Sequence, residues 1–271
     1  MSRRLPSDTF GPVKRLSDDE LDRRVREGLA AEVELFGSGA ESSRVLQLPG
    51  VIASVSPATP DRSIFNSVYA EDPGALADSI DELEAMYRDA GIRAWTVWLP
   101  GGHRVGHELL EPRGHAYDGS PRSMALELGG LREPARKLPG GVTLLGGDAR
   151  EAAVINDRAY GLGPGAWASA FARTPSFPVR WAVAVWDGEP VACAAALDVG
   201  DDASITAVGT VPERKGNGLA GRLIHALLTE AAGRGARTGS LQASRAGAPV
   251  YERLGFRDLG CMDLWEKRVE R

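Results

Sequence analysis

The segment from Ser204 to Ile224 constrains this chain most, because its residue pattern predicts a strand, a sharp turn and a helix in direct succession. β-Branched residues continue to Val211, and Pro212 then ends the strand because it has no N–H to donate to a neighbouring strand. Gly216 and Gly218 are typical of a turn. Leucines then recur at helical spacing, at Leu219, Leu223 and Leu227, so a helix is expected to begin near Gly218.

The charges at this turn favour an anion-binding site. The free N–H groups at the start of a helix, and the positive end of its dipole, normally attract acidic side chains. Here the helix is instead preceded by Arg214 and Lys215. A phosphate or pyrophosphate on the turn would bond the free N–H groups and offset both cations, and glycine allows the close backbone approach that this needs.

The chain is long enough for two domains, since its 271 residues exceed what one core usually holds. The segment 131–141 contains two prolines, a Gly-Gly pair and mixed charges without periodicity, so it is the predicted boundary. Residues 1–135 are therefore assigned to a first domain and residues 141–271 to a second.

Composition limits the classes of partner. The sequence is 43% apolar and 25% charged, which is typical of a soluble globular protein, and its formal charge of -5 gives no electrostatic reason to expect a nucleic acid. Residues 1–6 are basic but no apolar segment follows them, and the most apolar stretch, 181–199, is interrupted by charges and a proline. We therefore expect no export signal, no membrane span and a cytoplasmic location.

The cysteines and histidines do not indicate a metal or thiol site. Cys193 and Cys261 lie in apolar, strand-like segments, which favours buried thiols over a disulfide or a nucleophile. His103, His107 and His115 have no Cys or Asp nearby at ligand spacing, so no metal site is expected.

Strands and helices alternate along the rest of the chain. A capping box at Ser17 predicts an amphipathic helix, and Asp72 followed by Pro73 predicts another that ends near Gly91. In the first half, strands are expected over residues 44–55, 63–69, 93–99 and 122–128, with a short helix near Glu108. In the second half, strands are expected over 142–145, 181–186, 191–198, 204–211, 239–243 and 256–267, and helices over 148–160, 166–172 and 248–254, with Asp187-Gly188 as a hairpin turn.

Two motifs in the second half go together. The first runs from Thr210 through Pro212 to Ala220 and is similar to V-x-P-x-x-[RQ]-x-x-G-x-[GA], with Lys215 replacing the usual arginine or glutamine. The second runs over residues 241–256 and ends in Tyr-Glu-Arg-Leu-Gly-Phe. With their flanking strands they resemble the acetyl-CoA signature of the GCN5-related N-acetyltransferase (GNAT) family, over residues 142–267. Lysine keeps the positive charge but lacks the planar guanidinium group of arginine, so the replacement at Lys215 affects how tightly a cofactor is bound.

The resemblance implies a mixed α/β sheet flanked by helices and acetyl-CoA as co-substrate. It implies that an amine acceptor attacks directly in a ternary complex, and that Tyr251 protonates the leaving thiolate; the other interpretation is that Tyr251 only anchors its short helix. Ser244 stands where many members have asparagine, and either contacts the cofactor arm or caps the helix. The implied cofactor-binding residues are Val208, Gly209 and Thr210 for the pantetheine, and Arg214, Lys215, Gly216, Asn217, Gly218, Leu219 and Ala220 for the pyrophosphate.

The acceptor and the base are not fixed by the sequence. Small amines and protein N-termini are both compatible with the resemblance, and the acidic balance favours a cationic amine. Asp198 and Glu213 are candidate bases or solvated surface charges. Three aromatic residues, Trp167, Phe171 and Phe177, either line an acceptor pocket or pack in the core. The chain is expected to be a monomer or a homodimer.

An internal repeat extends the resemblance to the first half. Ile64 and Ile205 lie 205−64 = 141 residues apart, and the same offset relates Leu110 to Tyr251. The first half, however, has Glu71 and Asp72 where the second has its cationic glycine turn, and these acids would repel a pyrophosphate. We expect two tandem GNAT-like domains, each with a mostly antiparallel sheet, of which the first is a degenerate copy without cofactor binding.

Two other functions are compatible with the turn. Gly216 to Gly221 also satisfies G-x-G-x-x-G, but four residues separate it from Val211 and the next strand ends without an acidic residue, which disfavours a dinucleotide-binding oxidoreductase. A P-loop is excluded because no G-K-[ST] is present. A non-catalytic acetyl-CoA sensor on the same fold stays possible.

Overall fold

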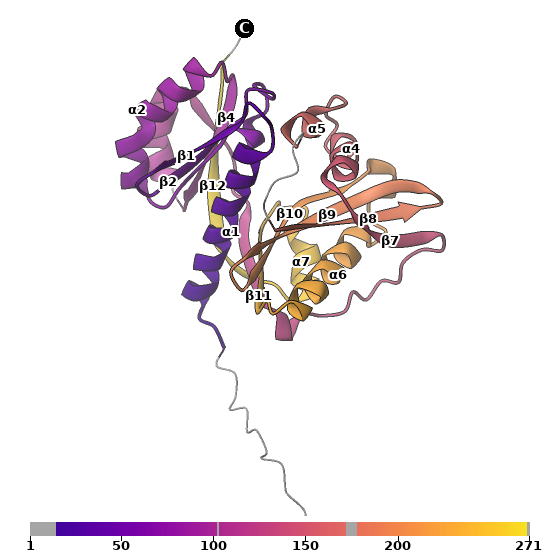
Figure 1. Ribbon diagram of the computed structural model, residues 1–271. Helices are drawn as coiled ribbons and strands as arrows, with labels where there is room; N and C mark the ends of the chain where they lie inside the picture. Colours follow the sequence, from indigo (N-terminus) through magenta and orange to yellow (C-terminus); the bar gives the residue numbers. More distant parts are fainter. Residues whose placement is uncertain (1–14, 102, 172–177, 270–271) are drawn as a thin grey trace, which may run out of the picture.

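The computed structural model describes residues 15–101, 103–171 and 178–269, and it shows two halves joined by one sheet (Figure 1). The first half contains α1 (Asp18–Ser38), β1 (Arg44–Leu48), β2 (Val51–Val55), η1 (Ser63–Phe65), β3 (Ser67–Ala70), α2 (Pro73–Asp89), β4 (Ala94–Pro100), α3 (His103–Val105), η2 (Gly106–Leu110), η3 (Glu111–Arg113), β5 (His115–Gly119), β6 (Arg122–Glu127) and η4 (Leu128–Gly130). The second contains β7 (Val142–Gly147), α4 (Ala149–Ala159), α5 (Ala166–Ala170), β8 (Val179–Trp186), β9 (Glu189–Val199), β10 (Asp202–Thr210), η5 (Pro212–Arg214), α6 (Leu219–Gly233), β11 (Thr238–Ala243), α7 (Ala248–Leu254) and β12 (Arg257–Arg268).

The strands form a 12-stranded mixed sheet in the order β1-β2-β3-β4-β12-β6-β11-β10-β9-β8-β7, with β5 paired to β12 off this path. Among the described strands, β3 with β4 and β10 with β11 are the parallel pairs. Each parallel pair is connected by a helix, α2 or α6, as a parallel connection requires. The mixed α/β class is therefore confirmed, although the two expected sheets are one continuous sheet.

The two halves exchange their last strands. β6 belongs to the first half in sequence, yet it pairs with β11 and with the beginning of β12 in the second half. The remainder of β12, from Met262 to Arg268, pairs with β4 and β5 of the first half. Each half thus lends one strand to the other, and the predicted boundary at residues 131–141 separates the halves in sequence but not in the sheet.

Helix α1 covers one face of the sheet across both halves and runs between them in Figure 1. Its predicted apolar stripe is buried: Leu29 and Val33 pack with Tyr69, Trp98 and Met262, while Leu21 and Val25 pack against Ala125 of β6. Burying each such side chain contributes about 2 kcal/mol. Because α1 spans the junction, it holds the halves in one arrangement.

A buried charged residue connects the two halves at this junction. Arg24 of α1 is 6% exposed and donates to Asp201 (2.6 Å) and to the hydroxyl of Thr238 (2.9 Å), both in the second half. The buried guanidinium is therefore paired and hydrogen-bonded, as a buried charge must be.

Several predicted elements differ from the structure. Residues 44–55 are a hairpin of two strands, because Gly50 turns the chain at φ +68°. Residues 63–65 are a 3-10 turn, and β5 was not expected because its sequence, His-Ala-Tyr-Asp-Gly, lacks an apolar alternation. Cys261 is exposed, so only Cys193 fits the expected buried thiol. Asp187 and Gly188 have the positive φ values of the predicted hairpin turn.

The halves share an order of elements. β1-β2-β3-α2-β4 in the first half corresponds to β8-β9-β10-α6-β11 in the second, and both continue through short helical turns into two strand positions. Their central turns differ, because β3 ends at Ala70 and α2 begins at Pro73, whereas β10 ends at Thr210 and α6 begins at Leu219. The longer turn of the second half is the one that carries the glycines and cations.

Candidate functional site

The second half contains an opening between two parallel strands. β10 pairs with β11 only from Asp202 to Ser204, although β10 continues to Thr210 and β11 to Ala243. Beyond Ser204 the facing edges of β10 and β11 are not hydrogen-bonded to each other, so their backbone groups can bond an extended ligand that lies between the two strands. Val208, Gly209 and Thr210 lie on the diverging part of β10.

A bulge in β10 sits at the start of this opening. The register with β9 shifts between Thr206 and Gly209, and Ala207 has φ +51°, which costs a non-glycine residue free energy. The Asn156 side chain lies so close to residue 209 that only glycine fits there, because a Cβ on Gly209 would lie 2.3 Å from Oδ1 of Asn156. That Oδ1 is buried without a hydrogen-bond partner, while Asn156 Nδ2 donates to the carbonyl of Ala207 (3.4 Å).

The opening ends at the predicted glycine turn. Gly216 and Gly218 both have φ +79°, and Gly218 directly precedes α6, so the first N–H groups of that 15-residue helix are uncapped by any side chain. Lys215 is exposed. Arg214 lies over the Trp186 ring at 4.1 Å, and Asn217 braces the turn by donating to the carbonyl of Arg214 (3.1 Å). The turn therefore has the geometry of an anion site.

Arg136 is a further cation at this turn that the sequence pattern does not indicate. It belongs to the connection between the halves, donates to the carbonyl of Gly216, and packs its methylene groups over Gly218. Arg222 of α6 fixes this connection by donating to the carbonyl of Arg136 (3.0 Å). An arginine 80 residues away in sequence can be assigned to the turn only from the fold.

Tyr251 lies in α7 and is 7% exposed. Burial, and to a smaller extent the nearby phenol of Tyr160, raise its pKa well above the usual value, so it keeps its proton at neutral pH. Within the described part of the chain its hydroxyl makes no hydrogen bond. Tyr160 donates to the carbonyl of Val208 (2.9 Å) and thereby lies beside the diverging part of β10.

Glu32 of α1 is a carboxyl group that the sequence analysis did not place at the site. It accepts a hydrogen bond from the hydroxyl of Thr206, the residue directly before the strained Ala207. Burial of the carboxyl raises its pKa to about 7, although the Thr206 hydroxyl partly opposes this shift. The only sequence signal was a glutamate beside the buried stripe of α1, next to Val33, and that signal does not say what the helix covers.

The two predicted candidate bases are engaged elsewhere. Asp198 pairs with Arg234 at the end of α6 (2.7 Å), and Glu213 pairs with Arg158 (2.9 Å). The pKa of Glu213 is lowered by its own backbone N–H and by Arg158. Both carboxylates therefore fit the surface-charge interpretation, which leaves Glu32 as the carboxyl beside the bulge.

Other predicted residues have structural contacts. The Ser244 hydroxyl accepts from the N–H of Gly247 (3.1 Å) in the turn that leads into α7, and α7 itself has no side-chain cap. Trp167 and Phe171 are buried and pack with Phe36 and Phe65 of the first half, so they belong to a core between the halves; Phe177 lies outside the described residues.

The matching region of the first half is closed. β3 is four residues long and pairs with β4 over Ser67–Tyr69, so no comparable divergence exists there. Asp72 caps α2 with its own carboxylate, which accepts from Gly74 and Ala75 and occupies the place of an anion. Leu110, which corresponds to Tyr251, is fully buried.

Comparison with protein families gives a match within the second half. Residues 156–256 match the model described as the acetyltransferase (GNAT) family, and this range includes β10, the glycine turn and Tyr251. A search of curated proteins gave no match. In the part of the chain that the structure describes, no helix has the length and apolar character to cross a membrane.

Solved structures share the architecture of most of the chain. A GCN5-related N-acetyltransferase from Kribbella flavida is 18% identical, with a TM-score of 0.64 over 91% of this chain and 96% of that one. A GCN5-related N-acetyltransferase from Sphaerobacter thermophilus is 21% identical, with a TM-score of 0.58 over 82% and 78%. A tandem GNAT protein from the clavulanic acid biosynthesis pathway is 12% identical, with a TM-score of 0.52 over 94% and 98%. At these identities the likeness concerns the fold.

Proposed function

Since residues 156–256 form a domain of the acetyltransferase (GNAT) family, we propose that the second half binds acetyl-CoA and transfers its acetyl group to a primary amine. The observation that carries this proposal is the opening between β10 and β11, which ends at an uncapped helix start with two positive-φ glycines. An extended arm fits the strand edges, and a pyrophosphate fits the turn.

The residues of the opening suit the two ends of acetyl-CoA. The backbone of Val208, Gly209 and Thr210 would bond the pantetheine amides, and an N–H near the bulge would polarise the thioester carbonyl. Lys215 and the N–H groups at Gly218 would hold the pyrophosphate, and Arg136 would add a guanidinium to the same phosphates. The remaining predicted turn residues, Arg214, Gly216, Asn217, Leu219 and Ala220, shape this cradle.

Two side chains are placed to move protons in the transfer. Glu32 would accept the proton of the incoming ammonium, because its carboxyl lies beside the bulge and its pKa of about 7 suits a base at neutral pH. The amine nitrogen then attacks the thioester carbonyl. As the C–S bond breaks, Tyr251 gives its proton to the leaving sulfur, and the second proton that the nitrogen loses passes through water to the Tyr251 phenolate. Direct attack in a ternary complex needs no acyl-enzyme, and buried Cys193, whose pKa burial raises to about 12, is unsuited to form one.

The first half is proposed to support the site without binding cofactor itself. It lacks the strand divergence, places Asp72 at the helix start and holds Leu110 instead of a tyrosine. It nevertheless supplies α1, and therefore Glu32, to the second half. This explains physically why the degenerate copy and the proposed catalytic copy form one unit.

The test is the release of free CoA thiol from acetyl-CoA by the purified chain with a panel of amines, including polyamines, amino acids and peptides with free N-termini. We expect release that depends on an amine, and more release with cationic amines because the chain is acidic. Acetyl-CoA binding without release for any amine would instead identify a sensor. Failure of acetyl-CoA to bind, with stabilisation by NAD(P)H, would contradict the proposal.

A further inference from the structure

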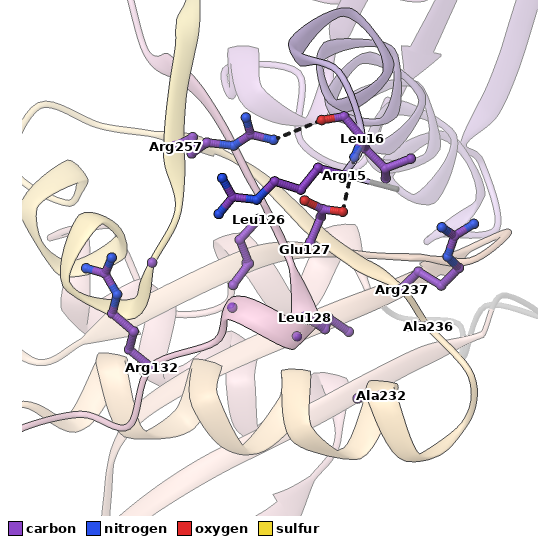
Figure 2. Close-up of a pocket in the computed structure, with 13 residues that line it drawn as sticks. Arg15, Leu16, Leu126, Glu127, Leu128, Arg132, Ala232, Ala236, Arg237 and Arg257 are labelled. Carbon is purple, nitrogen blue, oxygen red and sulfur yellow. Dashed lines mark hydrogen bonds between the residues drawn. The ribbon is translucent and has the colours of Figure 1, made fainter. Parts of the chain in front are cut away.

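A pocket lies at the end of α6 that is away from the glycine turn. It has a volume of about 900 Å³, which is within the size range of small-molecule sites. It is bordered by the start of α1, by η4 after β6, by the connection from α6 to β11, and by the beginning of β12, so both halves contribute to it. Figure 2 shows this pocket.

Four arginines line the pocket from four segments: Arg15, Arg132, Arg237 and Arg257. Two of them have acidic partners, since Arg257 pairs with Asp18 (2.6 Å) and Arg237 lies 3.7 Å from Asp201. Among the described residues, the guanidinium groups of Arg15 and Arg132 make no hydrogen bond or ion pair. In Figure 2, Arg15, Arg132 and Arg257 lie on one side of the pocket and Arg237 on the other.

Among the described residues, the acids near the pocket do not balance its four arginines, because Asp18 and Asp201 pair with two of them and Asp201 also pairs with Arg24. The one acidic residue of the lining, Glu127, accepts a hydrogen bond from the backbone N–H of Leu16 (3.1 Å), and its carboxylate offsets only one of the two unpaired guanidinium charges. In a protein with a formal charge of -5, this accumulation of cations is a local exception.

The frame of the pocket is fixed and partly apolar. The backbone N–H of Leu128 donates to the carbonyl of Arg237 (2.8 Å), and that of Arg132 donates to Leu254 (2.9 Å), so the segments carrying two of the arginines are anchored. Leu128, Ala232 and Ala236 provide apolar surface beside the guanidinium groups. A ligand of this pocket therefore combines an anionic group with an apolar or aromatic body.

We propose that this pocket binds an organic phosphate, with the phosphate between Arg15 and Arg132 and the body against Leu128 and Ala232. A phosphate monoester carries about −1.5 to −2 charges at neutral pH, which suits a lining in which four arginines face one carboxylate, and its oxygens accept the paired N–H donors of arginine. The site is distinct from the glycine turn, because the 15 residues of α6 separate the two ends by about 22 Å.

The test is isothermal titration calorimetry of the full chain with AMP, a phosphate monoester on an aromatic body, compared with adenosine and inorganic phosphate. We expect one AMP per chain, weaker binding of inorganic phosphate, and little binding of adenosine. The double variant Arg15→Ala/Arg132→Ala should lose at least roughly tenfold in AMP affinity, which is a change of about 1.4 kcal/mol. Both side chains are exposed, so a normal unfolding temperature is expected and should be checked.

Two controls keep the result specific. Arg88→Ala removes an exposed arginine from α2 and should leave AMP binding unchanged. Arg136→Ala/Lys215→Ala alters the glycine turn and should also leave it unchanged. The proposal is wrong if the wild-type chain does not bind AMP, if Arg15→Ala/Arg132→Ala binds it normally, or if the turn variant is the one that loses it. None of these outcomes depends on acetyl transfer.

Discussion

Gly106 faces the indole ring of Trp265 so closely that a Cβ atom built on Gly106 would lie 1.9 Å from ring atom Cε2. Trp265 is 1% exposed and belongs to β12, the strand that the second half lends to the first. This contact therefore stabilises β12 in its place in the first half, because the indole ring fits into the first-half core only if residue 106 has no side chain.

Gly106→Ala should destabilise the chain by roughly 3 kcal/mol, since a buried indole cannot move aside without disturbing the ladder between β4 and β12. Urea unfolding followed by tryptophan fluorescence measures the change. Gly129→Ala is the matched control, because a Cβ there meets no atom within 4 Å, and its effect should stay within about 0.5 kcal/mol. Equal effects of the two substitutions would show that the packing at Trp265 is not decisive.

Tyr251→Phe should lower kcat for acetyl transfer by roughly a hundredfold while leaving the KM for acetyl-CoA nearly unchanged, because only the proton donated to sulfur is lost. Initial rates of thiol release with a working amine check this. Tyr117→Phe, an exposed tyrosine of β5, should behave as wild type. Unchanged turnover in Tyr251→Phe would restrict this residue to anchoring α7.

Glu32→Gln should abolish the part of the pH–rate profile that depends on a base. With its pKa raised to about 7, Glu32 is deprotonated only as pH rises through neutrality, so wild-type kcat/KM should rise through that range. Glu32→Gln should lower kcat/KM by at least roughly tenfold, and its kcat/KM should not rise through neutral pH. Glu32→Asp should keep a smaller rise of kcat/KM over the same range. Glu34→Gln on the same helix is the control, and a profile shared by all four proteins would rule out Glu32 as the base.

The raised pKa of Glu32 should affect stability in the opposite direction to activity as the pH rises. Between its ordinary value of 4.5 and about 7, folded Glu32 holds a proton that the unfolded chain has lost, so its contribution to the free energy of unfolding falls as pH rises through this window. Glu32→Gln should therefore be more stable than wild type above pH 7, and this difference should disappear below about pH 4.5. Thermal unfolding across pH measures it; a constant difference would mean that the carboxyl is not desolvated.

Arg136→Ala should raise the KM for acetyl-CoA several-fold with little change in kcat, because it removes a phosphate contact that the ground state and the transition state share. Lys137→Ala removes the neighbouring exposed cation and is the matched control. Steady-state rates at varied acetyl-CoA concentration separate the two. A lower KM in Arg136→Ala would show that Arg136 covers the turn and competes with the cofactor.

Local patterns predicted the elements that local forces determine. The stripe of α1 beginning at Leu21 is buried, Asp72 caps α2 as its position before Pro73 indicated, and Asp187-Gly188 turns the hairpin. Each depends on residues within a few positions of one another. Two predictions were wrong where the local pattern was ambiguous. At Gly50 a hairpin turn interrupts a run of strand-forming residues that was predicted as one strand. The polar strand β5 was not predicted, because it forms through its pairing with β12.

The candidate site was predictable in its turn but not in its surroundings. Gly216 and Gly218 were expected at a turn before a helix, and the structure gives both the positive φ that glycine tolerates best. Thr206 and Glu32 are 174 residues apart, and no periodicity links them. Their contact exists because α1 crosses from one half to the other.

By itself, the sequence determined the strand, the cationic glycine turn and the helix from Ser204 to Ile224, because β-branching, glycine conformation and leucine spacing act over a few residues. Tertiary structure alone decided that β6 and β12 change places and that α1 brings Glu32 to the bulge. Alternation along a strand specifies which face is buried but not which strand lies beside it, so the partner is selected only when the whole sheet assembles.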